Sequence, residues 1–232
     1  MDVLLLVAVA PVALPLALAV FAVNALAFRS PRAAFFLQER QGRNGRPFRM
    51  VKFRTMAPAR DAMTSWSSGQ DQLRVTRLGK LLRNTHLDEL PQLWNIARGE
   101  MSFVGPRPEM LPIEAWAAER VPGWKSRDRR LRPGVTGLAQ ITQGYVGCDA
   151  TGYARKLELN EDYLATLSLR GDLRIVLGTL LWMLRGRGWQ WNASEKTKAS
   201  DSAIEPSARH ESAVRPRAAR TAVEIPFRSG RS

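Results

Sequence analysis

The first thirty residues carry the strongest hydrophobic pattern in the chain. From Val3 to Phe28 no side chain is charged, and Asn24 is the one clearly polar residue. About 20 apolar residues suffice to cross a bilayer, so this run is long enough for a membrane helix. Pro11 and Pro15 lie inside it. Because proline removes a backbone donor and clashes with the preceding turn, we expect the helix to be kinked or broken there.

Three structures fit this run: a cleaved signal peptide, a spanning helix, and a helix that enters the membrane and turns back. A signal peptide normally begins with basic residues, whereas this chain begins Met1-Asp2. A break at Pro15 leaves two pieces of about a dozen residues, each about 18 Å long. Neither piece alone crosses a hydrocarbon core of about 30 Å. A hairpin within one leaflet and a kinked spanning helix are therefore both compatible with the sequence.

The distribution of charged and apolar residues divides the rest of the chain into two parts. Between residues 27 and 60 there are nine Arg or Lys and one acid, Glu39. Basic flanks mark the cytoplasmic side of a membrane, so we expect residues 1–30 to be the membrane segment and residues 31–191 a cytoplasmic domain. Residues 192–232 hold eight bases, five acids and almost no large apolar side chains, which predicts a disordered basic tail.

The remaining pattern predicts a helix-rich α+β fold with a small hairpin or sheet. Apolar stretches on either side of Asn44-Gly45, a strong hairpin-turn signal, predict strands between residues 35 and 56. Apolar residues at helical spacing predict helices over residues 78–82, 87–96, 112–120, 153–164 and 172–184. Polar or Pro/Gly-rich stretches predict loops at 61–71, 105–108 and 132–137. The last helix has an apolar body with a basic fringe, which suits an interfacial amphipathic helix or an ordinary packed one.

Composition narrows the chemistry. The 232 residues contain 35 Lys or Arg against 21 Asp or Glu, a formal net charge of +14. This excess favours an anionic partner: nucleic acid, an anionic membrane surface or phosphorylated substrates. One cysteine, Cys148, and two histidines exclude a disulfide framework and a Cys-based or multi-histidine metal site, so any metal would be a hard cation held by oxygen. The glycine motifs of dinucleotide-binding and P-loop proteins are absent from the sequence.

The adjacent acids Asp88 and Glu89 are the candidate catalytic residues. A carboxylate can attack phosphorus and form an acyl phosphate, and its neighbour could help to hold Mg²⁺, which prefers one or two protein oxygens plus substrate phosphates. Arg83, just upstream, and the start of a helix would keep the nucleophile ionised. The structural alternative is a helix cap, because Thr85 and Asp88 have the spacing of a capping box.

Basic residues in stiff segments are candidate phosphate ligands. Arg107 and Arg132 each lie in a Pro/Gly-rich loop, and the planar guanidinium suits diphosphate oxygens. Lys52 and Arg54 flank Phe53 in a predicted strand, so alternation places both bases on one face. For all four, an ordinary solvated charge is the alternative. His86 precedes the acidic pair and is a candidate proton carrier, although a histidine near a helix start is more often structural.

Several stretches, taken in order, resemble the bacterial sugar transferase family, the monotopic polyprenyl-phosphate phosphoglycosyl transferases. They follow the apolar run and together extend the resemblance over residues 1–186. The motifs are Lys52-Phe53-Arg54-Thr55-Met56, Thr76-Arg77-Leu78-Gly79-Lys80 continuing into Leu87-Asp88-Glu89-Leu90-Pro91-Gln92-Leu93, Met101-Ser102-Phe103-Val104-Gly105-Pro106-Arg107-Pro108, and Arg132-Pro133-Gly134-Val135-Thr136-Gly137.

The resemblance implies transfer of a sugar 1-phosphate from a UDP-sugar to undecaprenyl phosphate at the cytoplasmic face of the bacterial inner membrane. It implies Asp88 as the nucleophile that forms a covalent sugar-phosphate and expels UMP, Glu89 as its assistant, Mg²⁺ as the cofactor, and Arg107 and Arg132 as phosphate ligands. It also implies a re-entrant helix broken at Pro15. Such a reaction starts exopolysaccharide, capsule, O-antigen or glycoprotein glycan assembly and involves no nucleic acid. The oligomeric state stays open.

The rival hypothesis is a membrane-tethered basic protein that binds anions or serves as a scaffold without catalysis. It accounts for the charge and for the apolar anchor. It gives no reason for an acidic pair among the basic motifs, so the enzyme is the preferred interpretation.

Overall fold

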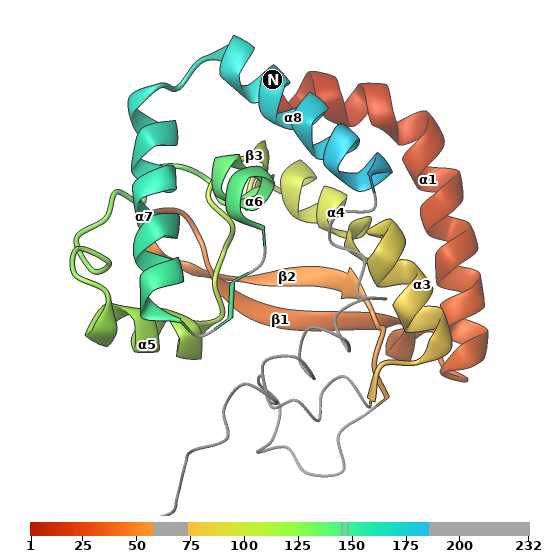
Figure 1. The fold of residues 1–232 in the computed structure, drawn as a ribbon. Coiled ribbons are helices and arrows are strands. Elements are labelled where there is room, and N and C mark those ends of the chain that lie inside the picture. Colours follow the sequence, from red (N-terminus) through yellow and green to blue (C-terminus); the bar gives the residue numbers. More distant parts are fainter. Residues whose placement is uncertain (58–73, 145, 148, 186–232) are drawn as a thin grey trace, which may run out of the picture. The chain divides into compact units, whose positions relative to one another are not determined.

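The computed structural model describes residues 1–57, 74–144, 146–147 and 149–185 (Figure 1). All of them belong to one unit, Met1–Asn192. The predicted loop 61–71, Cys148 and the predicted tail 192–232 lie outside the described residues. The helices are α1 (Asp2–Ala27), α3 (Arg77–Thr85), α4 (Gln92–Ala97), α5 (Leu111–Arg120), α6 (Leu138–Gln143), α7 (Ala150–Ala165) and α8 (Leu169–Leu184), with 3₁₀ turns at Arg32–Ala34, Arg43–Gly45 and Leu87–Glu89. The strands are β1 (Phe35–Gln41), β2 (Pro47–Phe53), β3 (Ser102–Val104) and β4 (Gly134–Thr136). The helix-rich α+β architecture with a small sheet is thus confirmed.

Helix α1 runs through both of its prolines without interruption. Figure 1 shows that it bends along its length, so the loss of backbone donors at Pro11 and Pro15 is accommodated by curvature rather than by the predicted break. Among the described residues it is the one helix long and apolar enough to cross a membrane. Its inner face packs on the protein, where Val20 joins Phe53 and Leu82 in an apolar cluster.

The predicted hairpin is present. Strands β1 and β2 pair antiparallel from Phe35 opposite Phe53 to Gln41 opposite Pro47. The connection uses Asn44 at φ 55° and Gly45 at φ 75°, the left-handed conformations for which these two residue types are suited. The hairpin carries Phe53 toward α1 and α3.

A strand within the predicted loop 132–137 pairs with a strand that directly precedes the predicted loop 105–108. The prediction of a loop is therefore confirmed for residues 105–108 and wrong for residues 134–136, which form β4. Strand β3 runs parallel to β4, with Ser102 opposite Gly134 and Val104 opposite Thr136. The backbones approach so closely that a Cβ on Gly134 would lie 2.1 Å from the Gly105 nitrogen. Glycine therefore allows the two backbones to lie in close contact. This contact positions the loop that carries Arg107, two residues after Gly105.

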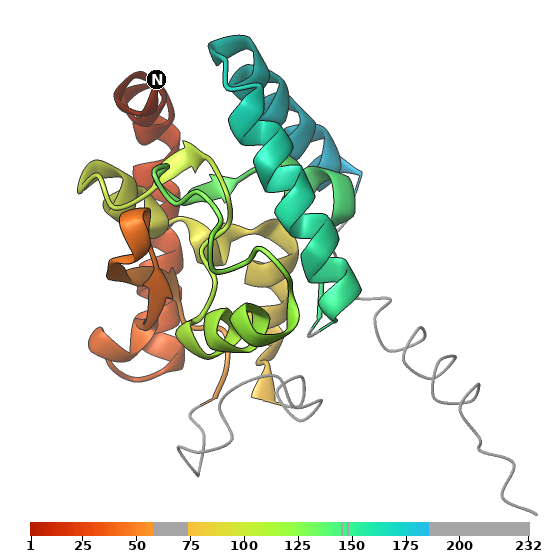
Figure 2. The ribbon, with the colours of Figure 1, turned by 90° about the vertical axis from the view of Figure 1, so that its left-hand side faces the viewer.

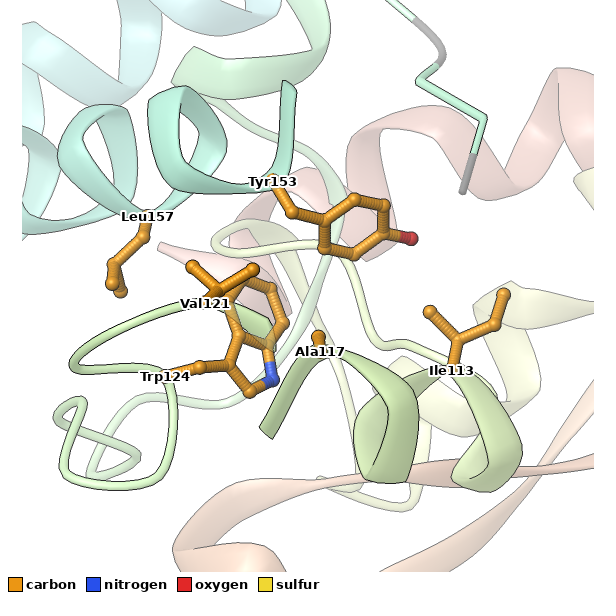
Figure 3. Packing of buried hydrophobic residues seen from close by; sticks show 6 residues of the cluster. All are labelled: Ile113, Ala117, Val121, Trp124, Tyr153 and Leu157. Carbon is orange, nitrogen blue, oxygen red and sulfur yellow. The ribbon is translucent and has the colours of Figure 1, made fainter. Parts of the chain in front are cut away.

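Helices α5 and α7 are joined by a buried apolar cluster. Figure 3 shows Ile113 and Ala117 from α5 facing Tyr153 and Leu157 from α7, with Trp124 between them. The Trp124 ring is 1% exposed, and its Nε1 donates to Glu114 Oε2 at 2.9 Å, so the buried polar atom is satisfied. This packing fixes the first half of α7 against α5.

Helix α8 is amphipathic, as its pattern predicts. Its residue Ile175 is buried, whereas Leu169, Leu173 and Leu177 are 70%, 53% and 52% exposed. Figure 2 shows α8 and the start of α1 at the same end of the structure. Both helices present exposed apolar side chains there. This arrangement supports the prediction that they lie at a membrane interface.

Candidate active site

The acidic pair lies on a tight turn between two helices. Helix α3 ends at Thr85, His86 takes the left-handed conformation (φ 56°), and Leu87–Glu89 forms a single 3₁₀ turn. Helix α4 begins only at Gln92, after Pro91. The predicted continuous helix over residues 87–96 is therefore wrong in its first part, because the left-handed His86 turns the chain and the new helix starts behind the proline.

The capping alternative is also excluded by the geometry. The Thr85 hydroxyl donates back to the carbonyl of Leu81 at 2.8 Å, as a residue in the last turn of α3 does, and so it does not cap a helix at Asp88. The true cap of α3 is Thr76, whose hydroxyl accepts from the Gly79 nitrogen at 2.9 Å. Gly79 is required because a Cβ there would lie 2.0 Å from the Thr55 carbonyl oxygen. This contact sets α3, and so the turn after it, against the end of β2.

Glu89 is largely buried, with 12% of its side chain exposed, and it is held by two basic groups. Its Oε1 accepts from Lys52 Nζ at 2.6 Å and from Arg107 Nη2 at 2.8 Å. Burial alone would raise the pKa of Glu89, but Arg107 and Lys52 outweigh this effect and keep the pKa well below its ordinary value. Glu89 is consequently an ionised link between strand β2 and the loop after β3.

Asp88 has the opposite electrostatic balance. Burial raises its pKa from 3.8 to about 6, and the negative charge of Glu89 adds to the increase. The positive charges of Lys52, Arg83 and Arg107 counteract this only in part. Arg83 is itself positioned by Thr55, to whose hydroxyl its Nε donates at 2.9 Å. Asp88 is therefore a poorly solvated carboxyl next to several cations, which is a suitable environment for a nucleophile toward phosphorus.

The structure brings some of the predicted phosphate ligands to the pair and leaves others elsewhere. Lys52, Arg83 and Arg107 surround it, as described above. Arg54 instead donates to the carbonyl oxygens of Ala33 at 2.7 Å and Phe35 at 3.4 Å. Arg54 therefore does not join Lys52 at the acidic pair. Arg132 lies 3.9 Å from the Asp2 carboxylate at the start of α1.

A cavity of about 400 Å³ opens beside the acidic pair. Glu89, Arg107 and His86 line one part of it, whereas Asp88 is not among the described residues that form its wall. Burial lowers the pKa of His86, which favours the neutral imidazole. Five further lining residues lie in the motifs that resemble the family: Leu90, Leu93, Phe103, Val135 and Thr136. Sequence reasoning did not identify the other lining residues: Arg40, Glu109, Ile113, Ala139, Gln140, Ile141, Gln143, Gly144, Val146, Tyr153, Lys156, Thr179 and Met183.

A second charged group lies on this cavity wall. Buried Glu109 accepts from Lys156 Nζ and from Tyr153 Oη, the latter at 3.2 Å. Lys156 and Arg107 outweigh burial and lower the pKa of Glu109. Nearby, burial and the charge of Arg107 reduce the pKa of Arg40 to about 10. The one sequence signal was that Glu109 closes the Gly-Pro-Arg-Pro stretch; nothing local marks Arg40 or Lys156.

The acidic pair has the donor set that Mg²⁺ requires. Both hydrogen bonds to Glu89 end on Oε1, so its Oε2 and the Asp88 carboxyl are the oxygens that a cation could take. Among the described residues no cluster of three or more His, Cys, Asp or Glu forms a metal site. One or two carboxylates completed by substrate phosphates is the usual arrangement for Mg²⁺, so the residues fit this ion.

Comparisons with known proteins show what this chain is similar to. The chain is 40% identical over 164 residues to a UDP-glucose:undecaprenyl-phosphate glucose-1-phosphate transferase of Caulobacter vibrioides, covering 70% of this chain and 61% of the relative. It is 37% identical over 188 residues to a UDP-N-acetylgalactosamine-undecaprenyl-phosphate N-acetylgalactosaminephosphotransferase of Aeromonas hydrophila, covering 81% and 44%. It is 38% identical over 179 residues to the exopolysaccharide production protein ExoY of Sinorhizobium fredii, covering 69% and 74%. The first two relatives thus extend well beyond the matched part. The family model of bacterial sugar transferases matches residues 1–186, and the chain belongs to that family.

Proposed function

We propose that this chain moves a sugar 1-phosphate from a UDP-sugar to undecaprenyl phosphate, through a covalent sugar-phosphate on Asp88. One observation carries the proposal: Glu89 forms ion pairs with Lys52 and Arg107, whereas the neighbouring Asp88, which is 7% exposed, has no such ion pair with the described residues. The pKa of Asp88 is accordingly raised and that of Glu89 lowered. A carboxyl that is buried without such pairing costs stability. The presence of Asp88 at this position therefore supports a chemical role for it. The names of the relatives support the choice of donor and acceptor.

In the first step the Asp88 carboxylate attacks the phosphorus that bears the sugar. A carboxylate–phosphorus bond forms, the bond from that phosphorus to the bridging diphosphate oxygen breaks, and UMP leaves with the bonding electrons. Lys52, Arg83 and Arg107 lie where charge on the phosphoryl oxygens can be stabilised. Mg²⁺ held by Asp88 and Glu89 would supply further charge neutralisation on the diphosphate.

In the second step a phosphate oxygen of undecaprenyl phosphate attacks the same phosphorus. The new diphosphate bond forms, the acyl-phosphate bond breaks, and Asp88 is released as a carboxylate. No net proton transfer to a side chain is needed, so the residues around the pair act by position and charge. The product is a lipid-linked sugar diphosphate, the start of an exopolysaccharide, capsule, O-antigen or glycan.

The lipid acceptor requires a site at the membrane, and α1 supports a re-entrant attachment on the cytoplasmic face. At its start, Asp2 Oδ1 accepts from Ser102 Oγ at 2.8 Å and from the Phe103 nitrogen at 3.2 Å. Near its end, Asn24 Nδ2 donates to the carbonyl oxygens of Ala34 and Arg54, each at 3.0 Å. Both ends of α1 are thus held by the same domain, which supports attachment from one side of the membrane.

Trapping the intermediate tests the proposal. Purified full-length protein incubated with each of a panel of UDP-sugars, without lipid acceptor, is expected to release about one equivalent of UMP and to gain the mass of a sugar phosphate on the peptide that contains Asp88. The Asp88→Asn variant should show neither signal. Turnover in that variant, or a reaction that begins only when both substrates are present, would exclude the covalent route; absence of any reaction with every donor would favour the non-catalytic binding protein.

A further inference from the structure

Gln140 has a buried amide that no described group satisfies. It lies in the first turns of α6 and lines the 400 Å³ cavity. Both its Nε2 and its Oε1 are inaccessible to solvent and lack a hydrogen-bond partner within the described part of the chain. An unpaired buried donor and acceptor are costly, and folded proteins contain few of them. A cavity-lining amide with both atoms unsatisfied therefore indicates a ligand with a complementary donor and acceptor.

The protein around Gln140 is suited to a flat ring. The parallel pairing of β3 with β4 places Phe103 and Val135 on neighbouring strands, and both side chains line the cavity. Ile141, which follows Gln140, lines it too. An aromatic and two branched aliphatic side chains bury a planar heterocycle well, whereas a hydroxylated sugar would suit the charged residues around Glu109 better.

The same wall leads directly to the phosphate ligands. Arg107 Nη1 lies 3.5 Å from the Val135 carbonyl oxygen, and its Nη2 donates to Glu89. Gln140 follows Val135 by five residues, across the end of β4 and the start of α6. A nucleotide whose phosphates lie at Arg107 would therefore extend its base along β4 toward Gln140.

We propose that Gln140 recognises the uracil of the donor nucleotide. Uracil presents an N3–H donor beside the O4 acceptor, so Gln140 Oε1 would accept from N3–H while Nε2 donates to O4. The inference rests on the proposed function, since it assigns the base site of the same UDP-sugar. The Gln92 amide is also buried without a hydrogen-bond partner among the described residues, but Gln92 does not line this cavity. Gln143 lines it, but its Nε2 already donates to the Gly152 carbonyl oxygen at 2.8 Å.

Modified nucleotides test the base edge without altering the protein. Binding of UMP and of N3-methyl-UMP to the full-length protein in detergent is measured by calorimetry. Methylation removes the donor that Oε1 would accept, so binding is expected to weaken about 10- to 100-fold. CMP alone would be a weaker probe, because a rotated amide can also pair with cytosine.

The Gln140→Leu variant tests the residue, with Gln143→Leu as the matched control one turn away. Leucine removes the amide oxygen that would accept from N3–H. The ratio of UMP to N3-methyl-UMP affinity should therefore fall to near one in Gln140→Leu and stay at its wild-type value in Gln143→Leu. A general loss of packing would lower both affinities and leave their ratio constant.

The outcomes separate the two proposals. If UMP binds but N3-methylation has no effect, or if Gln140→Leu leaves the ratio of UMP to N3-methyl-UMP affinity unchanged, the assignment of Gln140 is wrong and the transferase proposal stands. If UMP shows no binding and UDP-sugars yield no adduct on Asp88, the nucleotide donor itself is wrong, and the assignment of Gln140 is wrong with it.

Discussion

Asp88 and Glu89 carry the same functional group one residue apart, and their surroundings separate them. The 3₁₀ turn points the Glu89 carboxylate at Lys52 and Arg107, with which it forms ion pairs. Asp88 is shielded from water, with 7% of the residue exposed, and has its pKa raised to about 6. Two carboxyls with opposite pKa shifts are a recurrent feature of catalytic sites, because one can act while the other holds the surrounding cations.

The shift at Asp88 predicts a trade-off between stability and activity. A pKa raised from 3.8 to about 6 means that the folded state holds the proton more tightly than the unfolded state, so the ionised carboxylate destabilises the fold at neutral pH. The upper limit of this cost is about 3 kcal/mol. We expect Asp88→Asn to abolish transfer and yet to raise the melting temperature by several degrees at pH 7.

The pH dependence distinguishes this cause from a general packing effect. Without added metal, the wild type should lose stability relative to Asp88→Asn as the pH rises from about 4 to about 6, and the difference should be constant above that window. Thermal unfolding of both proteins in the same detergent, at half-unit pH steps with a chelator present, measures it. Equal melting temperatures at every pH would show that the buried carboxylate carries no such cost.

At the scale of elements, Asn24 fixes the end of an otherwise apolar helix. It is 0% exposed, and its amide nitrogen bonds two backbone carbonyls at the edge of the β1–β2 hairpin. Replacing it by leucine would leave both carbonyls buried without this donor. We expect Asn24→Leu to cost about 2–3 kcal/mol and to lower activity, because the hairpin that carries Lys52 loses its attachment to α1.

The neighbouring Val23 supplies the control for this anchor. Its side chain is 50% exposed, so Val23→Leu adds the same side chain to α1 without removing a buried hydrogen bond. Its melting temperature and activity should equal those of the wild type. If Asn24→Leu proves as stable as Val23→Leu in thermal unfolding, the amide is dispensable and apolar packing alone holds the helix.

Features that depend on interactions between residues close in the sequence were predicted correctly, whereas features that depend on contacts between distant segments were not. The hairpin at Asn44-Gly45 and the helices α3, α5, α7 and α8 depend on local pattern, and each is found. The β3–β4 pair joins segments about thirty residues apart through close glycine contacts. The local signal at β4 indicates only a loop, and no local signal marks β3. Helix α4 starts late because His86 adopts a left-handed conformation, which residue preferences do not predict.

The candidate site divides in the same way. Asp88, Glu89 and Arg107 are recognisable because each lies within a contiguous motif. Lys156 and Gln140 reach the cavity only through the packing of α6 and α7, so no local pattern marks them. Arg132 lies in a similar motif but faces Asp2 rather than the acidic pair. A motif therefore identifies chemistry within a segment, and tertiary structure decides which segments share a cavity.

At the scale of the whole molecule, two surface properties bear on the proposed function: exposed apolar side chains and a positive net charge. Exposed apolar side chains gather on α1 and α8, including Leu4 at 77% and Leu169 at 70%. In the proposed function, the formal charge of +14 would lower the repulsion between an anionic lipid phosphate and an anionic nucleotide sugar. The proposed function requires the domain to lie on one membrane surface, so the path of α1 tests this arrangement.

The hydrogen bonds of Asp2 predict that the N-terminus stays on the cytoplasmic side. A spanning α1 would carry Asp2 across the bilayer and break its bonds to Ser102 and Phe103. In a Cys148→Ser background, a cysteine is added directly before Met1, and cells are treated with a membrane-impermeant maleimide. We expect labelling only after the membrane is permeabilised.

A second cysteine on the domain calibrates this measurement. Glu119→Cys in the same background replaces a side chain that is 69% exposed on α5 and should also be labelled only after permeabilisation. A re-entrant α1 requires the two sites to behave alike, since the same domain holds both ends of the helix. If the N-terminal cysteine reacts in intact cells while Cys at position 119 does not, α1 crosses the membrane, and the contacts of Asp2 do not form in the cell.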